Sequence, residues 1–234
     1  MLQLRPSVSW LIQSCLGVLL ASVFVLGAGC TKPYHDGKKT TPDNAPEEKK
    51  EQDPKALLVG GKLVFEDSFD RSEFGANWQT KSDKWSVQDG AVKVQGARNE
   101  GLWLMSDLPR KARVEFEARS DSKDGDIKCE IFNTEPEHQK GYVPILGGWN
   151  NSLSIIARLD EHGDDRLTTR DKKVEIGKNH RFVFARTDKD LYWWVDGELF
   201  LVYRDSAPVL GKYFGFNNWD SAVTFDNLKV YELP

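Results

Sequence analysis

One stretch of this chain, from residue 147 to residue 166, gathers side chains that could bind a polar ligand. It combines an indole ring, amides, a guanidinium group, carboxylates and an imidazole. Arg, Asn and carboxylate groups hydrogen-bond hydroxyls in pairs, and an indole offers a face for stacking, so the combination suits a carbohydrate. The candidate ligand-binding residues here are Trp149, Asn150, Asn151, Arg158, Asp160, Glu161 and His162.

The acidic loop at the end of this stretch has three competing interpretations. Asp and Gly favour turns for conformational reasons, so the loop could be a plain solvated turn. It could instead be part of the ligand site, with Glu161 and His162 as candidates for acid–base catalysis. The third interpretation is a Ca²⁺ site at Asp160, Asp164 and Asp165, because calcium takes several carboxylate and carbonyl oxygens. Calcium is thus the one cofactor that the sequence suggests.

A second loop, near the C-terminal end, resembles the first in composition. Asn217, Asn218, Trp219 and Asp220 again combine amides with an indole. Turn formation by Asn is the simple interpretation, and an exposed indole would favour ligand binding. We therefore add Trp219 to the candidate ligand-binding residues.

These loops need a β framework to position them. From Leu57 onward, short alternating segments are separated by Gly, Asn and Asp at intervals typical of a sandwich or barrel. The hairpin signal is strongest at Asp196–Gly197, which suits a two-residue type I′ turn. We expect strands at 64–69, 85–87, 91–94, 101–105, 113–119, 126–132, 153–159, 181–186, 191–195, 199–203, 213–217 and 223–231.

The expected strand at 153–159 decides where the first loop points. Ile155 and Ala157 alternate with Ser154, Ile156 and Arg158, which predicts that Ile155 and Ala157 face the core and the other three the opposite, largely polar face. Arg158 would then share a polar face with Asp160, close to one rim of the sheet. This orientation is the basis for including Arg158 and Asp160 in the candidate site.

Three segments of the ordered part together resemble a known superfamily. They are the opening Phe-Glu-Asp-Ser-Phe at 65–69 with Asn77 and Trp78, the hairpin at 195–197, and the closing strand at 223–231. In this order they are similar to the concanavalin A-like lectin/glucanase superfamily, over residues 63–234. The resemblance implies an all-β jelly-roll sandwich of two antiparallel sheets, with ligands on the concave sheet and its rim. It implies no particular activity, because functions are grafted onto folds.

Catalytic members of glycoside hydrolase family 16 in this superfamily carry a strand motif of several carboxylates. The nearest match is Glu115 and Glu117, but the intervening Asp and the third carboxylate are missing. Arg113 and Arg119 share the face of these two residues. We therefore expect a solvated, self-neutralising charge ladder there and no family 16 catalysis.

The first residues of the chain indicate where the protein works. Arg5 precedes a long apolar run that ends in Leu-Gly-Ala-Gly-Cys at 26–30, the pattern of a secretory signal over 1–29. The Cys after small residues resembles the lipobox of bacterial lipoproteins, which implies a lipid on Cys30. Acyl chains would anchor the protein to a membrane of the cell envelope.

Two other outcomes for this segment stay open. Gly27 stands where a lipobox has Leu, Val or Ile, and Gly27 and Gly29 also fit ordinary signal cleavage, which would give a periplasmic or secreted protein. An uncleaved anchor over 10–26 is the other outcome, since a membrane span needs at least about 17 residues. For a lipidated protein, Thr31 favours the outer membrane, because it is not the Asp that resembles an inner-membrane retention signal.

Composition sets the remaining limits. Residues 30–56 are charged and Pro-containing, which predicts a disordered tether before a domain at 57–234. The formal net charge is −4 and the chain has no basic stripe, which argues against a nucleic-acid partner. Cys129 lies between Ile127 and Ile131 in an alternating pattern, so we expect a small buried hydrophobe there.

The sequence thus predicts a carbohydrate-binding jelly-roll lipoprotein anchored in the cell envelope, with a glycan or other polar ligand as its partner. One alternative is a glycan-acting hydrolase or lyase with an atypical site. Another is a non-catalytic envelope module that binds proteins, which would bury Trp149 and Trp219 and turn the acidic loop away from any cleft.

Overall fold

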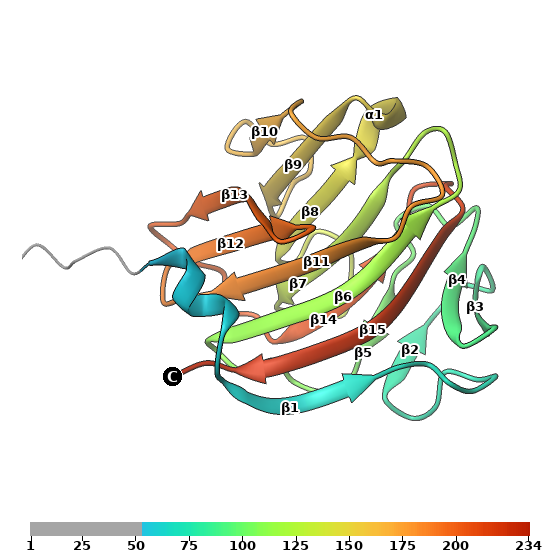
Figure 1. Cartoon of the computed structure of the whole chain (residues 1–234), viewed down its shortest axis with the longest axis horizontal. Helices are drawn as coiled ribbons and strands as arrows, with labels where there is room; N and C mark the ends of the chain where they lie inside the picture. The colour runs from blue at the N-terminus through green and yellow to red at the C-terminus, as the bar shows by residue number, and fades with distance from the viewer. Residues whose placement is uncertain (1–52) are drawn as a thin grey trace, which may run out of the picture. The chain divides into compact units, whose positions relative to one another are not determined.

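The computed structural model describes residues 53–234, so the predicted signal segment, Cys30 and most of the predicted tether lie outside the described residues. Two antiparallel sheets pack face to face (Figure 1). The eight-stranded sheet has the order β13-β12-β11-β6-β15-β4-β3, and β1 pairs with β15. Its strands are β1 (Lys62–Asp67), β3 (Trp85–Gln88), β4 (Ala91–Val94), β6 (Ala112–Ser120), β11 (His180–Arg186), β12 (Asp190–Val195), β13 (Glu198–Arg204) and β15 (Val223–Glu232).

The seven-stranded sheet has the order β10-β9-β8-β7-β14-β5-β2. Its strands are β2 (Trp78–Thr80), β5 (Leu102–Leu104), β7 (Ile127–Asn133), β8 (Tyr142–Gly147), β9 (Leu153–Arg158), β10 (Leu167–Thr169) and β14 (Tyr213–Asn217). A 3₁₀ helix, η1 (Pro54–Leu58), and a single turn, α1 (Gly148–Asn151), complete the described elements. The predicted all-β sandwich of two antiparallel sheets is therefore confirmed. No helix within residues 53–234 is long and apolar enough to cross a membrane.

Each strand expected from the sequence is present, and three further strands are not in the prediction. β2 and β10 have only three residues each, too few to show alternation. β8 is buried at every position and contains Pro144, so it has no polar face to reveal it. The hairpin prediction is confirmed: β12 and β13 pair, and both Asp196 (φ 55°) and Gly197 (φ 84°) have positive φ.

Aromatic side chains fill the space between the sheets. Phe116 of β6 stacks on Phe182 of β11 with ring centroids 5.0 Å apart, and Phe216 of β14 stacks on Phe225 of β15 at 4.3 Å. Burial of such rings supplies much of the hydrophobic stabilisation of a sandwich. Cys129 lies in the same core at 2% exposure, as the sequence predicts, and burial raises the pKa of its thiol.

The orientation predicted for β9 is wrong. Ile156, and not Ile155 or Ala157, lies in the core between the sheets. Ile155 and Ala157 join Val143 and Ile145 of β8 in a separate apolar cluster on the other face of the sheet. Because β9 carries buried apolar residues on both faces, the alternation of its side chains could not identify the core face.

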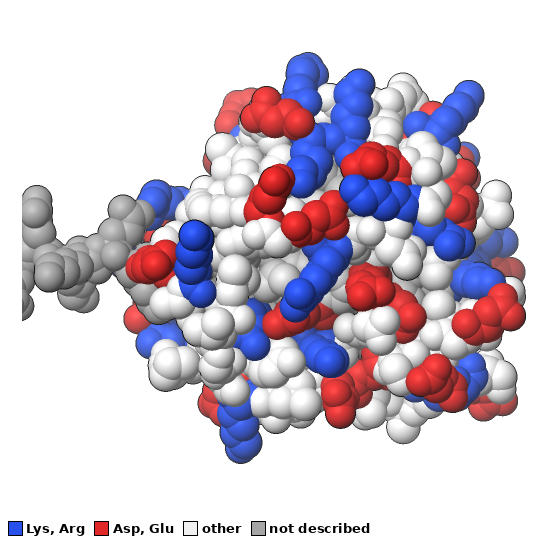
Figure 2. All heavy atoms as spheres, in the orientation of Figure 1, with Lys and Arg blue, Asp and Glu red and all other residues white. Residues whose placement is uncertain are grey.

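Of the two carboxylates that most resembled a catalytic pair, Glu115 forms ion pairs on the eight-stranded sheet, and Glu117 accepts from Asn227 Nδ2 at 3.4 Å. Arg113 Nε donates to Glu115 Oε1 at 2.6 Å, and Arg181 Nη2 donates to Glu115 Oε2 at 2.7 Å. Arg113 is buried, contrary to the solvated ladder expected, because its Nη1 also donates to the carbonyl oxygen of Leu57 in η1. Basic and acidic side chains are interspersed over the face seen in Figure 2.

Candidate functional site

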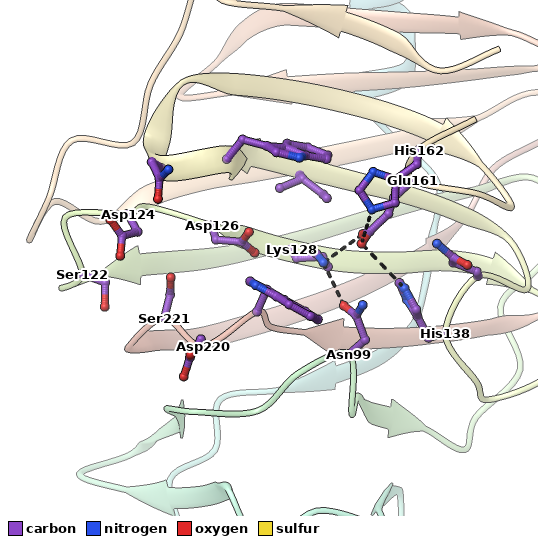
Figure 3. A pocket seen from close by; sticks show the side chains of 15 residues that line it. Asn99, Ser122, Asp124, Asp126, Lys128, His138, Glu161, His162, Asp220 and Ser221 are labelled. Carbon is purple, nitrogen blue, oxygen red and sulfur yellow. Dashed lines mark hydrogen bonds and ion pairs between the residues drawn. The ribbon is translucent and has the colours of Figure 1, made fainter. Parts of the chain in front are cut away.

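A cleft of about 660 Å³ opens on the seven-stranded sheet, on the face opposite the core (Figure 3). Lys128 of β7 and Ile145 of β8 line it from the sheet, and loops supply the other residues. The lining residues are Asn99, Ser122, Asp124, Asp126, Lys128, His138, Gln139, Ile145, Trp149, Asn150, Glu161, His162, Trp219, Asp220 and Ser221.

Sheet topology brings the two indoles of the cleft together. β8 and β14 both pair antiparallel with β7, so they run parallel and end at the same edge of the sheet. Trp149 follows β8 and Trp219 follows β14, on either side of β7. Their exposed fractions are 36% and 50%, and no other tryptophan within residues 53–234 is exposed. The other described tryptophans are buried.

The turn that carries Trp149 is a left-handed one. Trp149, Asn150 and Asn151 have φ values of 51°, 58° and 56°. A non-glycine residue in this conformation costs about 1–2 kcal/mol, and such strain clusters at functional sites. Asn151 holds the turn in place, because its amide accepts from the Val174 N–H and donates to the Val174 carbonyl, both at 2.9 Å.

A buried ion pair lies at the centre of the cleft. Lys128 Nζ donates to Glu161 Oε2 and to Asn99 Oδ1, both at 2.9 Å. Burial acts to raise the pKa of Glu161, but the Lys128 ammonium and the nearby His138 and His162 outweigh it and lower the pKa. Glu161 Oε1 faces His162 Nε2 at 3.7 Å and His138 Nε2 at 4.0 Å. This carboxylate is therefore held ionised next to two imidazoles.

A second buried carboxylate lies behind the first. Glu130 of β7 is fully buried and accepts from Asn217 Nδ2 at 2.6 Å and from Asn133 Nδ2 at 2.8 Å. Its Oε1 also contacts His138 Nδ1. His138 thus links Glu130 to Glu161, while its Nε2 has no hydrogen-bond partner. The arrangement fixes the orientation of the His138 ring and directs Nε2 towards Glu161.

A third buried carboxyl, that of Asp126, has an oxygen without a hydrogen-bond partner. Asp126 precedes β7 with a φ of 56°, and its N–H donates to the Gly147 carbonyl at 2.9 Å. The residue is 8% exposed, and its Oδ1 has no hydrogen-bond partner. Burial raises the pKa of Asp126 to about 6; the Lys128 ammonium opposes this rise and the Glu161 carboxylate adds to it.

Five of the residues singled out from the sequence lie together in the cleft. They are Trp149, Asn150, Glu161, His162 and Trp219. The His162 ring packs edge-on against the Trp149 indole, with centroids 5.7 Å apart, and the Arg166 guanidinium lies 5.2 Å from the same indole. The indole and the acidic loop that the sequence placed at opposite ends of a strand are thus in contact.

Three other candidate residues do not line the cleft. Asn151 anchors the turn through Val174. Arg158 points to the core side of β9, where its Nε donates to Asp205 at 3.1 Å, because the face assignment of that strand was reversed. Asp160 is exposed and accepts from the His162 N–H at 2.9 Å, which is the ordinary turn role of an Asp.

Sequence reasoning missed Asp126, Lys128, Glu130 and His138. Lys128 and Glu130 flank Cys129, so the alternation that predicts a buried Cys129 also places both on the other face of the strand. The sequence therefore contained the signal that places Lys128 and Glu130 on the face opposite Cys129. His138 and Glu161 become neighbours only through the pairing of β7, β8 and β9, which the spacing of residues along the chain does not record.

The structure leaves the calcium prediction at Asp160, Asp164 and Asp165 untested. Across residues 53–234, no group of three or more His, Cys, Asp or Glu is arranged to hold a metal ion. Asp165 is engaged elsewhere, since its carbonyl oxygen accepts from the Tyr203 hydroxyl at 3.2 Å.

No protein-family model matches the sequence. Over 157 residues the chain is 23% identical to an extracellular exo-alpha-L-arabinofuranosidase of Streptomyces chartreusis; the match covers 67% of this chain and 19% of that protein. The chain therefore spans only a small part of this relative.

Solved structures resemble the described domain more completely. An endo-beta-1,3-glucanase of Pyrococcus furiosus superposes with a TM-score of 0.58 at 12% identity, over 74% of this chain and 94% of that one. The carbohydrate-binding module CBM66 of Bacillus subtilis gives 0.57 at 13% identity, over 67% and 96%. At these identities the likeness shows the fold alone, and the fold is the concanavalin A-like jelly roll that the sequence resembles.

Proposed function

We propose that the cleft on the seven-stranded sheet binds a carbohydrate. The observation that carries the proposal is the pair of exposed indoles, Trp149 and Trp219, on either side of a polar floor. Apolar sugar faces stack on such rings, while carboxylates, amides and imidazoles between them hydrogen-bond the hydroxyls. Glu161 and His162 belong to this polar set, and Asn150 adds an amide beside Trp149.

The names of similar proteins support the same class of ligand. The relative from Streptomyces chartreusis is an arabinofuranosidase, and the structural neighbours include a carbohydrate-binding module and glucanases. The rival interpretation as a protein-binding envelope module required both indoles to be buried and the acidic loop to avoid any cleft. Exposed Trp149 and Trp219, together with Glu161 in the cleft lining, argue against that rival.

The test is a glycan array followed by calorimetry on the purified full-length chain, with and without Ca²⁺. We expect saturable binding to one glycan class that Trp149→Ala and Trp219→Ala each weaken by at least about tenfold, as loss of a central aromatic anchor does. Leu199→Ala, an exposed apolar residue on the other sheet, is the matched control. Binding that survives both Trp substitutions would overturn the site, and binding only with Ca²⁺ would support the calcium prediction.

Glu161 and its imidazole neighbours favour a second candidate function, a glycan-acting hydrolase or lyase. A carboxylate held ionised by Lys128 is a suitable base, and exposed His162 at 3.7 Å is a suitable proton donor. If the cleft is catalytic, Glu161→Gln abolishes turnover while leaving glycan binding measurable. Binding without turnover by the unaltered protein would exclude this function for that glycan.

We further propose that a lipid on Cys30 holds the domain at the envelope, on the outer membrane, through the tether predicted at residues 30–56. The support is the signal pattern with Arg5 and the Cys that follows small residues. Cys30→Ser should move the protein from the membrane fraction to the soluble fraction of the producing cells. Soluble unaltered protein would instead indicate ordinary cleavage and a periplasmic or secreted protein.

A further inference from the structure

The two ends of the cleft differ in charge. At the Glu161 end, the Lys128 ammonium and the Glu161 carboxylate neutralise each other at 2.9 Å. Figure 3 shows Asp124, Ser122 and Ser221 towards the opposite end of the cleft, with Asp126 between them and Lys128. The cleft therefore has a neutralised end and an acidic end.

Among the described residues, part of the negative charge at the acidic end has no ion-pair partner. Asp220, at the same end, is paired with Arg98 at 2.8 Å. Within residues 53–234, neither Asp124 nor Asp126 has a Lys, Arg or His partner at ion-pair distance. Lys123 is next to Asp124 in the sequence but forms no ion pair with Asp124 or Asp126, and Lys128, two residues after Asp126, already donates to Glu161 and Asn99. A ligand at this end meets two carboxylates that form no ion pair with a cation of the described residues.

Unlike a carboxylate in a solvated acidic patch, the Asp126 carboxylate has an oxygen without a hydrogen-bond donor. Its side chain is buried in the cleft wall, and Oδ1 lacks a hydrogen-bond donor. A buried carboxylate without a donor costs free energy, which a ligand recovers if it supplies one. A hydroxyl supplies a hydrogen bond only, whereas an ammonium supplies both hydrogen bonds and the missing charge, so its bond is the stronger one.

The backbone holds Asp126 ready for such a ligand. Its positive φ and the hydrogen bond from its N–H to the Gly147 carbonyl fix it beside the turn that carries Trp149 and Asn150. A sugar ring stacked between the walls of the cleft would thus bring a ring substituent to Asp126. Ser122 and Ser221 lie nearby to bind hydroxyls of the same ring.

We propose that the acidic end of the cleft binds the protonated amine of an amino sugar, so that the glycan recognised carries at least one free amine. This inference rests on the proposed carbohydrate-binding function and names the class of sugar. Anionic glycans are disfavoured for the same reason, since their carboxylates or sulfates would face Asp124 and Asp126.

The test compares probes that differ in charge on the purified full-length chain by calorimetry. They are a β-1,4-linked glucosamine hexamer, its fully N-acetylated counterpart and an oligogalacturonate of equal length. At pH 7 we expect the glucosamine hexamer to bind about tenfold more tightly than the acetylated hexamer, the difference between a charged and a neutral hydrogen bond. The oligogalacturonate should bind most weakly, and Asp126→Asn should remove the preference for the free amine.

Lowering the pH distinguishes recognition by Asp126 from simple ligand charge. Between pH 7 and pH 5 the ligand amines become more fully protonated, yet the preference should fall, because Asp126 with a pKa of about 6 takes up its proton. The charged groups facing Asp126 are Lys128 on β7 and Glu161 from the loop after β9, with Asp124 close in sequence. A preference that instead grows towards pH 5 would overturn the role of Asp126.

Failure of this inference is separable from failure of the proposed function. Equal binding of the free and acetylated hexamers, or array binding to neutral glycans alone, would refute amino-sugar recognition and leave carbohydrate binding intact. Absence of binding to any glycan would refute both. Should Asp126→Asn not fold, Asp124→Asn at the exposed position offers a second reduction of charge, with exposed Asp188→Asn on the other sheet as control.

Discussion

Two glutamates, one in a strand and one in a loop, show what separates a structural ion pair from a candidate site. Glu115 on the eight-stranded sheet is paired through both oxygens, with Arg113 at 2.6 Å and Arg181 at 2.7 Å. Glu161, in the loop after β9 of the seven-stranded sheet, is paired through Oε2 only, and its Oε1 faces imidazole nitrogens beyond hydrogen-bond distance. The first carboxylate is complete without a ligand, and the second keeps an acceptor available.

The surroundings of the two glutamates differ in the same way. The Arg113 guanidinium is covered by η1, through its bond to the Leu57 carbonyl, and packs 4.1 Å from the Tyr231 ring. The cleft around Glu161 instead contains partnerless polar atoms at Asp126 and His138. Positive φ values also recur among its lining residues, at Asn99, Asp126, Gln139, Trp149, Asn150 and Asp220. The available oxygen of Glu161 and the left-handed backbone of the residues around it thus distinguish the cleft from the surroundings of Glu115.

The largest effect should come from removing the cation of each pair. Lys128→Met leaves Glu161 buried without its ammonium, which should lower the free energy of unfolding by about 3–5 kcal/mol. Arg181→Met, whose side chain is 62% exposed, should cost less than about 1 kcal/mol. Urea denaturation measures both. The double variant Lys128→Met/Glu161→Gln should regain most of the loss, and equal losses in the two single variants would contradict the comparison.

A smaller effect of opposite sign is expected at Asp126. Its pKa rises from an ordinary 3.8 to about 6, so the native state binds a proton that the unfolded state releases. Through this group, stability is greatest below pH 4 and is lost as the pH rises from about 4 through about 6, by about 2–3 kcal/mol in total. Asp126→Asn stays neutral at every pH. At pH 8 its free energy of unfolding should therefore exceed that of the unaltered protein by about 2–3 kcal/mol, with no such gain near pH 4.

Urea denaturation at both pH values measures this difference. Asp188→Asn, at an exposed position, controls for the loss of a carboxylate. A gain for Asp126→Asn that does not change with pH would mean that burial of the carboxyl is not its cause. The lowered pKa of Glu161 acts in the other direction, since its stabilisation is lost as the pH falls. Asp126→Asn is therefore compared with the unaltered protein at each pH, because both contain Glu161.

Local sequence patterns predict most of the strands of this fold, but they assign one strand the wrong face. The strands other than β2, β8 and β10, together with the Asp196–Gly197 hairpin, follow from local alternation and turn chemistry, and these were predicted. β9 was assigned the wrong face because Ile155 and Ile156 are both buried, one on each side of the sheet. That error carried Arg158 into the predicted site, although it binds Asp205 on the core side.

The site itself was predictable only where its residues are neighbours in the chain. Trp149, Glu161 and His162 fall within one short stretch and were found together. Lys128 and His138 join them through strand pairing, which depends on the whole sheet. No local pattern of charge or hydrophobicity predicts that His138 Nε2 lies 4.0 Å from Glu161 Oε1.

The smallest predicted effect isolates backbone strain in the cleft from the loss of the indole. Trp149→Ala and Trp149→Gly both remove the ring, but only glycine adopts a φ of 51° without strain. Trp149→Gly should therefore be more stable than Trp149→Ala by about 1 kcal/mol in thermal or urea unfolding. At Arg181, in the strand beside that of Glu115, the order of stability should reverse, because glycine costs about 0.5–1 kcal/mol relative to alanine in an ordinary strand.

If alanine is the more stable residue at both positions, the turn at 148–151 relaxes without cost, and backbone strain no longer separates the cleft from the ion pairs of the other sheet. If the glycine variant is the more stable one at Trp149 alone, the conformation that holds the indole over the cleft lowers the stability of the fold, as a ligand-binding role requires.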